Sequence, residues 1–243
     1  MQRAISDLRW EKAQVYERGF WSKQASLSPN EESRFRWYEE RARRIWGQVK
    51  PLLTAQEKIS VLEIGPGPVG IINYLEADER YAMDPLEDYF SRQPEFAHVR
   101  DGGVVRHSGA GEDILSLKKV FSFIILDNVL DHMKDPGRVL RGINQSLEPG
   151  GIMFMSLNIY TRFGAMLRNV MEFLEVDRGH PFNFSRSPVL SLLHESGFKV
   201  MWSQTEDYQT QKRRYRESGR VKEVLKSCFG MVDVRFSAYC RTA

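Results

Sequence analysis

The sequence predicts an α/β fold: a doubly wound, seven-stranded, mainly parallel sheet preceded by a helical cap. Two observations support this. From residue 59 onward, short apolar runs alternate with helical patterns, which is the order that βαβ units require. The first run, 59–64, passes into a turn with three glycines in six positions and then into a second apolar segment. That succession indicates a buried strand, a tight turn and the start of a helix.

The remaining elements follow from the same patterns. The run 121–126 consists of six consecutive apolar or small residues, as expected of a strand buried on both faces. Asp135-Pro136 provides a start signal for a helix whose inner face should include Leu147. Shorter helices are expected at 71–77 and 187–196. The other strands are predicted at 80–84, 104–107, 152–157, 199–204 and 231–239.

The glycine turn at 65–70 reads Gly-Pro-Gly-Pro-Val-Gly and fits the spacing of the dinucleotide fingerprint. In that fingerprint, backbone N–H groups of the turn donate to a pyrophosphate. Pro66 and Pro68 have no N–H to donate, so this turn is a poor phosphate site. It favours a ligand that approaches bare backbone without a phosphate, such as S-adenosylmethionine. Glu63 is the one charge in the apolar run and requires a partner.

Five motifs, in the expected order and spacing, resemble those of class I S-adenosylmethionine-dependent methyltransferases. They cover roughly residues 55–205. The resemblance implies a Rossmann-like sheet whose seventh strand lies antiparallel beside the sixth. It also implies S-adenosylmethionine as cofactor and S-adenosylhomocysteine as product. The motifs are Glu63-x-Gly65-x-Gly67, Asp84-Pro85-Leu86, Gly111-Glu112-Asp113, Asp127-Asn128-Val129-Leu130-Asp131-His132 and Leu147-Glu148-Pro149-Gly150-Gly151.

The cofactor site is expected at the ends of the predicted strands. Asp84 lies about 20 residues beyond Glu63, where a carboxylate can accept both ribose hydroxyls. Ala110 and Gly111 replace the acid and alanine that the family often has, which leaves Glu112, Asp113 or backbone to contact the adenine amino group. Ser122 likewise stands where the family often has an acid. The predicted cofactor residues are Glu63, Gly65, Pro66, Gly67, Asp84, Pro85, Gly111, Glu112, Asp113, Asp127 and Asn128.

Methyl transfer from a sulfonium depends mostly on alignment and exclusion of water. An alcohol or phenol acceptor also needs a base within hydrogen-bond reach. His132 after the fourth strand and His180 in a predicted lid are the main candidates, with Tyr160 as a third. Each histidine also has a plain structural interpretation, as an orienting residue or a surface loop residue. We predict no metal site, because Asp127 and Asn158 offer only two oxygens.

Two segments lie outside the predicted scaffold. Residues 1–52 carry two amphipathic helices rich in aromatic residues, either packed plainly on the domain of residues 53–243 or closing over its cofactor and acceptor. Residues 158–186 stand where the family inserts a substrate lid. The basic stretch 212–226 is expected to form a solvated edge. The arginines of the second helix are also expected to be solvated: Arg34, Arg36, Arg41, Arg43 and Arg44.

The composition is that of an ordinary globular protein. The chain has 243 residues, 42% of them hydrophobic and 28% charged, which is ordinary for a globular domain with an extension. A net charge of +3 does not require nucleic acid or a membrane as partner. Two cysteines, no signal-peptide pattern and no apolar run of bilayer length lead us to expect a cytoplasmic protein.

We therefore expect a biosynthetic enzyme that methylates oxygen on a small or medium acceptor: a sugar, glycan or natural product. The nearest alternative is an N-methyltransferase. From other classes, an NAD(P)-dependent oxidoreductase and a non-catalytic S-adenosylmethionine-binding protein stay open. Nucleic acid is not expected as acceptor, because no Asn/Asp-Pro-Pro-Tyr/Phe sequence follows the fourth strand. The oligomeric state, a homodimer included, is left open.

Overall fold

In the computed structural model, the described residues are 4–26, 31–53, 57–97, 100, 102–172 and 179–243. Seven strands form one sheet in the order β3-β2-β1-β4-β5-β7-β6. β7 runs antiparallel to both β5 and β6, and the other neighbouring pairs are parallel. The predicted fold class is confirmed. The strands are β1 Ser60–Ile64, β2 Glu79–Asp84, β3 Val104–Ser108, β4 Phe121–Asp127, β5 Leu147–Ile159, β6 Phe198–Thr205 and β7 Val234–Thr242.

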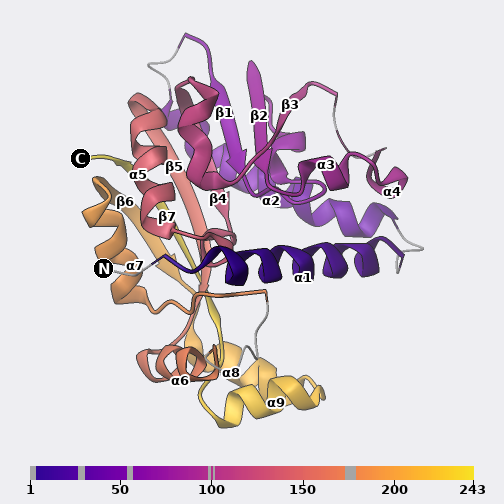
Figure 1. The fold of residues 1–243 in the computed structure, drawn as a ribbon. Helices are drawn as coiled ribbons and strands as arrows, with labels where there is room; N and C mark the ends of the chain where they lie inside the picture. The colour runs from indigo at the N-terminus through magenta and orange to yellow at the C-terminus, as the bar shows by residue number, and fades with distance from the viewer. Residues whose placement is uncertain (1–3, 27–30, 54–56, 98–99, 101, 173–178) are drawn as a thin grey trace.

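Helices cover both faces of the sheet, with α5 and α7 on one side and α2 on the other (Figure 1). The helix α1 lies across the carboxyl ends of the parallel strands, while α6, α8 and α9 lie beyond that edge (Figure 1). The helices are α1 Asp7–Ser26, α2 Glu31–Val49, α3 Glu87–Phe90, α4 Pro94–Ala97, α5 Pro136–Ser146, α6 Arg162–Glu172, α7 Arg186–Glu195, α8 Tyr208–Glu217 and α9 Val221–Cys228.

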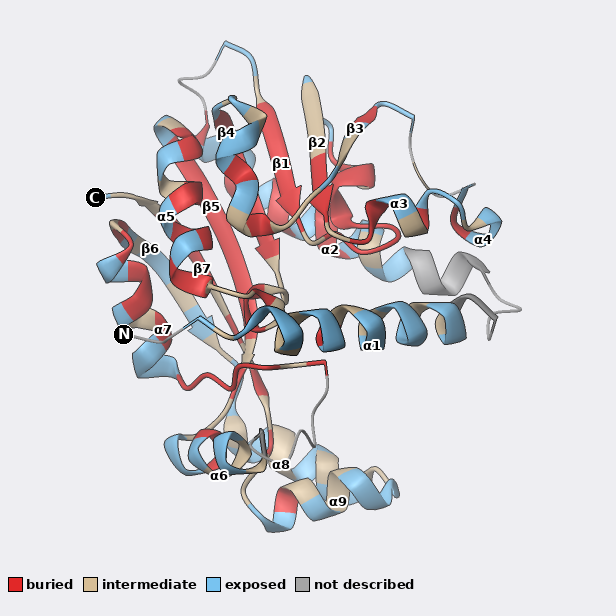
Figure 2. Cartoon of the chain, viewed as in Figure 1, coloured by how far each residue is buried: buried red, intermediate tan, exposed pale blue. Residues whose placement is uncertain are grey.

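The core is divided by the sheet, as alternation along the strands requires. Leu62 belongs to the cluster that includes Val139 of α5, whereas the adjacent Val61 belongs to the cluster that includes Ile45 of α2. Figure 2 shows the central strands almost wholly buried and α1 mostly exposed. Because α2 supplies one layer of this core, the predicted boundary between residues 52 and 53 does not coincide with a break in packing; it stays a prediction.

Three local predictions were wrong. The helix expected at 71–77 is a single 3₁₀ turn, Ile71–Tyr74, because Leu75 is already extended (φ −93°, ψ 138°) and leads toward β2. Leu147 begins β5 rather than ending α5. Arg41 is buried at 4% exposure, whereas Arg36, Arg43 and Arg44 are exposed as expected. The other residues on which these patterns rested, 28–30, Arg178 and the side chain of Arg34, lie outside the described part of the chain.

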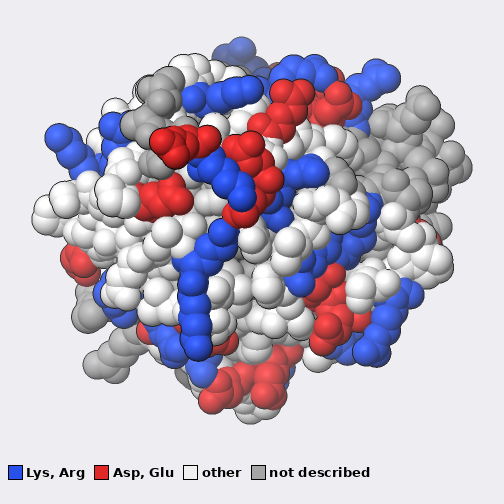
Figure 3. All heavy atoms as spheres, turned by 90° about the horizontal axis from the view of Figure 1, so that it is seen from above, with Lys and Arg blue, Asp and Glu red and all other residues white. Residues whose placement is uncertain are grey.

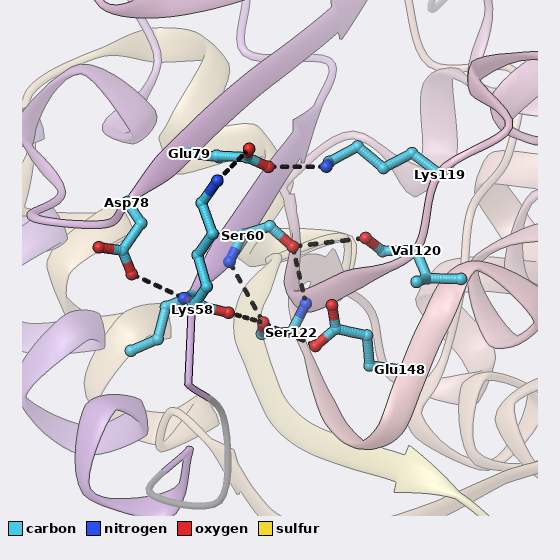
Figure 4. Close-up of polar contacts among 9 residues, drawn as sticks. Lys58, Ser60, Asp78, Glu79, Lys119, Val120, Ser122 and Glu148 are labelled. Carbon is cyan, nitrogen blue, oxygen red and sulfur yellow. Dashed lines mark hydrogen bonds and ion pairs between the residues drawn. The ribbon is translucent and has the colours of Figure 1, made fainter.

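At the amino edge of the sheet, a polar network joins β1, β2, β4 and β5 (Figure 4). Ser122 Oγ donates to Glu148 Oε2 (2.8 Å), and the Ser60 N–H donates to Ser122 Oγ (3.2 Å). Glu79 forms ion pairs of 2.6 Å with two lysine ammonium groups. Glu148 thus supplies, from the neighbouring strand, the carboxylate that the family often has at position 122. The network lies at the opposite edge of the sheet from the strand ends where ligands bind in such folds.

The outer segments carry few signs of a function. The basic segment of α8 and α9 is largely solvated, as predicted. On the face in Figure 3, basic and acidic side chains of the described residues alternate without a single-sign field. Tyr208 and Lys212, four residues apart on α8, have the Tyr-x-x-x-Lys spacing of a nicotinamide-dependent site, but neither lines the cavity described below. No helix within the described ranges is long and apolar enough to span a bilayer.

Candidate functional site

A cavity of about 450 Å³ lies at the carboxyl edge of the sheet, between the strand ends and α1. It is next to the β1–β4 switch point, where open α/β sheets bind ligands. Asp113 and Tyr160 do not line it. The predicted residues that do are Glu63, Gly65, Pro66, Gly67, Asp84, Pro85, Gly111, Glu112, Asp127, Asn128, His132 and His180.

Two positions of the glycine turn can hold only glycine. Gly65 has φ +67°, and a Cβ there would lie 2.3 Å from Cγ2 of Val129. Gly70 has φ +79°, and its Cβ would lie 2.6 Å from the Glu63 carboxylate. Both the backbone conformation and the space therefore require glycine. The result is a turn whose bare backbone forms one wall of the cavity.

Glu63 stabilises this turn from below. Its carboxylate accepts hydrogen bonds from the backbone N–H groups of Ile72 (2.8 Å) and Ile71 (3.3 Å), the first residues after the turn. Burial raises the pKa of Glu63 to about 8, although these two backbone donors favour the charged form. The partner that the sequence required for this carboxylate is thus the backbone of the segment that follows the turn.

Asp84 ends β2 with its carboxylate beside the turn. Its two oxygens accept from the backbone N–H groups of Gly67 (3.0 Å) and Leu86 (2.8 Å), and the residue is 6% exposed. Burial raises its pKa to about 6. Each carboxylate oxygen has a second lone pair, so Asp84 can still accept two further hydrogen bonds from a ligand such as a ribose diol.

Only one of the two carboxylate oxygens of Glu112 accepts hydrogen bonds from the described residues. Its Oε1 accepts from the backbone N–H groups of Lys134 (2.7 Å) and Asp135 (2.8 Å), while Oε2 is buried with no hydrogen-bond partner among the described residues. Asn128, at φ +56°, also has a buried Oδ1 that no described residue pairs with a hydrogen bond. Asp113, by contrast, faces an outer groove, 3.4 Å from the Arg138 guanidinium.

Asp127 at the end of β4 is held by a buried ion pair. The Arg41 guanidinium of α2 binds both of its oxygens and also donates to Ser156 Oγ (3.0 Å). Burial alone would raise the pKa of Asp127, but the hydrogen bonds and charge of Arg41 hold it below its usual value. Both oxygens of Asp127 are thus engaged by Arg41, and Ser156 Oγ also donates to Oδ1.

Two histidines and a buried aspartate gather on the cavity wall. His180 Nδ1 lies 2.8 Å from Asp131 Oδ2, and His132 Nε2 lies 3.9 Å from Asp131 Oδ1. The two imidazole centroids are 4.3 Å apart. Glu17 of α1 completes the group, with Oε1 3.4 Å from His132 Nδ1. The sequence predicted both histidines but neither carboxylate. Asp131 belongs to the fourth motif and directly precedes His132, but it was not singled out as a site residue.

The roof of the cavity is α1. Trp10, Phe20 and Trp21 line it from above, and the Trp21 ring lies directly over Gly67. Of the two interpretations of the N-terminal aromatic residues, this placement supports a cap for α1. The helix α2 serves both, because Trp37 and Tyr38 line the cavity while Trp46 packs in the core. The far wall holds Asn158 and Arg235, which face each other in register across β5 and β7. Sequence analysis did not identify Arg235, because a lone arginine in a strand carries no motif.

These features fit S-adenosylmethionine. The cavity offers a bare glycine turn and a carboxylate at the end of β2 that can accept further hydrogen bonds. It also offers two buried acceptors that no described residue pairs, Glu112 Oε2 and Asn128 Oδ1. Such acceptors can receive an exocyclic amine or an ammonium, and a buried acceptor left unpaired is costly. The donors that a pyrophosphate would require are missing at Pro66 and Pro68.

Comparison with known proteins agrees with a methyltransferase site. Residues 37–202, more than half of the chain, match the family model described as a methyltransferase domain. No curated protein matches the sequence.

Solved structures share the fold at low sequence identity. A putative sarcosine dimethylglycine methyltransferase from Galdieria sulphuraria is 13% identical (TM-score 0.62; 95% of this chain, 98% of that one). N-methyltransferase NodS from Bradyrhizobium japonicum, bound to S-adenosylhomocysteine, is 16% identical (TM-score 0.52; 82% and 86%). The plantazolicin methyltransferase BamL, also bound to S-adenosylhomocysteine, is 15% identical (TM-score 0.53; 97% and 98%). This chain belongs to the methyltransferase-domain family and is a class I S-adenosylmethionine-dependent methyltransferase.

Proposed function

We propose that this enzyme transfers the methyl group to an oxygen of a small or medium acceptor, in the class of sugars, glycans or natural products. The observation that supports oxygen is the group formed by Asp131, His132 and His180 beside the cofactor residues. A hydroxyl acceptor must lose its proton, and this group is built to promote that loss. Nucleic acid is not part of the proposal.

S-adenosylmethionine supplies, when bound, a methyl carbon on a sulfonium: the sulfur keeps the electron pair of the breaking bond while the acceptor oxygen bonds to carbon. The chain's residues do the rest. Asp84, Glu112 and the glycine turn hold the adenosyl end, and the α1 roof excludes water. His132 and His180 face the acceptor and promote loss of its hydroxyl proton, with Asp131 orienting the His180 ring. Tyr160, outside the cavity, stays a weaker proposal.

The decisive experiment is methyl transfer from labelled S-adenosylmethionine to paired acceptors that differ only in a hydroxyl or an amine at the same position. Transfer of the label to the hydroxyl acceptor but not to the amine acceptor supports the proposal. Labelled amines alone would establish the N-methyltransferase alternative. Binding of S-adenosylmethionine should be measured first by isothermal titration, so that a lack of transfer can be distinguished from a lack of cofactor.

Replacing both histidines should remove most of the turnover. We expect His132→Ala/His180→Ala to lower kcat on the hydroxyl acceptor by about 100-fold or more, in the range that positioned acid–base groups supply. The affinity for S-adenosylhomocysteine should stay within about threefold. His194→Ala, an exposed imidazole on α7, is the matched control and should leave both quantities unchanged. Full turnover in the double variant would remove these histidines from the mechanism.

Cofactor binding should weaken in acid because of Asp84. Burial raises the pKa of this carboxyl to about 6 in the free protein, and the neutral form cannot accept two ribose hydroxyls. Affinity for S-adenosylhomocysteine should therefore be flat above pH 7 and fall as the pH drops through 6, approaching tenfold per pH unit below it. Isothermal titration between pH 5 and 8 measures this. An Asp84→Asn variant has no carboxyl to titrate there and should show a flatter profile.

We also propose that the enzyme acts in the cytoplasm in biosynthesis. Cys228 and Cys240 are both free thiols, which is ordinary in a reducing compartment.

A further inference from the structure

We propose that Asp131, His132 and His180 bind one divalent transition-metal ion on the wall of the cavity. Each residue offers one ligand atom, and these three atoms lie within 4.8 Å of one another. The sequence led us to expect no metal site, because only the pair Asp127 and Asn158 was considered and it offers two oxygens. The two histidines are 48 positions apart, and the fold brings them together. Binding of the ion does not depend on the proposed function; its chemical consequence does.

The separations suit a first-row ion. Ligand atoms about 2.0–2.2 Å from a metal lie roughly 3.0–3.4 Å from each other in octahedral or tetrahedral geometry. The pairs measured here are 2.8 Å for His180 Nδ1 to Asp131 Oδ2 and 3.9 Å for His132 Nε2 to Asp131 Oδ1. The two distances end on different oxygens of Asp131, and the three ligand atoms lie within 4.8 Å of one another, so side-chain rotation would have to bring one oxygen and two nitrogens around a common ion.

Asp131 lacks a full set of partners. It is 5% exposed, and its Oδ1 has no hydrogen bond from any residue that the structure describes. A buried carboxylate oxygen without a donor is costly. The His180 ring reaches only its other oxygen, Oδ2. A divalent cation would satisfy Oδ1 and neutralise the carboxylate together.

Glu17 adds an outer partner of the kind that metal-bound histidines have. Ligating imidazoles usually point their second ring nitrogen at a carboxylate or carbonyl, which fixes the tautomer and the ring orientation. His132 directs Nε2 toward Asp131, and its Nδ1 lies 3.4 Å from Glu17 Oε1. Glu17 comes from α1, so the site also joins the roof of the cavity to the 3₁₀ turn after β4.

The ligand set determines the kind of ion. Two imidazoles with one carboxylate suit Mn²⁺, Fe²⁺, Co²⁺ or Zn²⁺, whereas Mg²⁺ prefers oxygen ligands and keeps its waters. Three protein ligands leave coordination positions for a small molecule. A coordinated hydroxyl has a lowered pKa. With the ion bound, the two histidines would hold the metal, and the proton of the coordinated hydroxyl would pass to a solvent water as its oxygen bonds to the methyl carbon.

The test is a titration of chelator-treated full-length protein with Zn²⁺, Mn²⁺ and Mg²⁺ separately, followed by Co²⁺ absorption spectra. We expect one equivalent of Zn²⁺ or Mn²⁺ to bind at least 100-fold more tightly than Mg²⁺, and visible Co²⁺ bands of nitrogen and oxygen ligation. His180→Ala should weaken Zn²⁺ binding at least 100-fold and remove the Co²⁺ bands. Glu17→Gln should weaken it about 10- to 100-fold.

His194→Ala is the matched imidazole control and should bind like the parent protein. Folding of each variant is checked by its affinity for S-adenosylhomocysteine. A parent protein that binds no Zn²⁺ or Mn²⁺, or a His180→Ala variant that binds them with unchanged affinity, would overturn the inference. The two proposals fail separately. Tight metal binding without transfer to a hydroxyl contradicts only the proposed function, and absence of metal binding contradicts only the metal site. Transfer at full rate in metal-free protein contradicts the role of the ion in activating the acceptor.

Discussion

Asp84→Ala should lose at least about 100-fold in affinity for S-adenosylhomocysteine. The carboxylate can accept two ribose hydroxyls, and a hydrogen bond to a charged group contributes about 1.5–3 kcal/mol. Two such bonds amount to about 3 kcal/mol or more, and every 1.4 kcal/mol is tenfold in the dissociation constant. Isothermal titration with S-adenosylmethionine and with its demethylated product measures the loss without an acceptor.

The control is Asp113→Ala. Both acids belong to the motifs that resemble the family, but Asp84 lines the cavity and Asp113 faces an outer groove. Asp113→Ala should therefore bind like the parent protein. Because Asp84 also holds the backbone N–H groups of Gly67 and Leu86, Asp84→Asn is needed beside it, since the amide keeps the size of the side chain and one acceptor oxygen. Near-parent affinity in Asp84→Ala would mean that the ribose is held elsewhere.

The sequence predicted the features that neighbouring residues determine by themselves, namely the glycine turn and the acid at the end of the second strand. A turn with glycines at set positions and an acid at the next strand end are encoded within about 20 residues, and the structure places both at the cavity. The alternation of apolar runs with helical patterns likewise predicted a doubly wound sheet, and the family resemblance added the antiparallel seventh strand. These signals are local, so no tertiary information is needed to find them.

Long-range pairings were not predictable. Asp131 and His180 are 49 positions apart and meet only because the segment after α6 returns to the cavity. Glu17 reaches His132 from the far end of the chain, on a helix that the sequence predicted to be amphipathic but whose apolar residues Leu8, Tyr16 and Phe20 are exposed. The metal-site inference could therefore arise only from the structure. Asp113 shows the reverse case, a motif residue that the fold turns away from the cavity.

Arg41 is the clearest error of composition-based reasoning. Five arginines on one helix suggest a solvated face, but helical spacing places Arg41 on the buried stripe with Ile45 and Val49, toward the core. There its guanidinium lies 5.5 Å from the Trp37 ring and pairs with Asp127. The position of Arg41 among the apolar residues of the helix predicts burial, but its partner, Asp127 at the end of β4, could be found only from the structure.

Arg41→Met should consequently lower stability far more than any other change of an arginine on α2. Removing one partner of a buried ion pair leaves the other charge uncompensated, at a cost of about 3–5 kcal/mol. For a chain of this length each kcal/mol shifts Tm by about 2–4 °C, so we expect a fall of about 10 °C by calorimetry. Arg43→Met, two positions along, removes an exposed pair with Glu39 (side chains 71% and 49% exposed) and should cost less than 1 kcal/mol.

A second substitution separates charge from packing. If the loss in Arg41→Met comes from the carboxylate left behind, Arg41→Met/Asp127→Asn should regain part of it, because a neutral amide is cheaper to bury than an unpaired charge. A double variant no more stable than Arg41→Met would assign the loss to packing against Trp37 and Phe154 instead. If Arg41→Met melts within 1 °C of Arg43→Met, the buried pair does not stabilise the fold, and the N-terminal helices are held to the sheet by their apolar stripe alone.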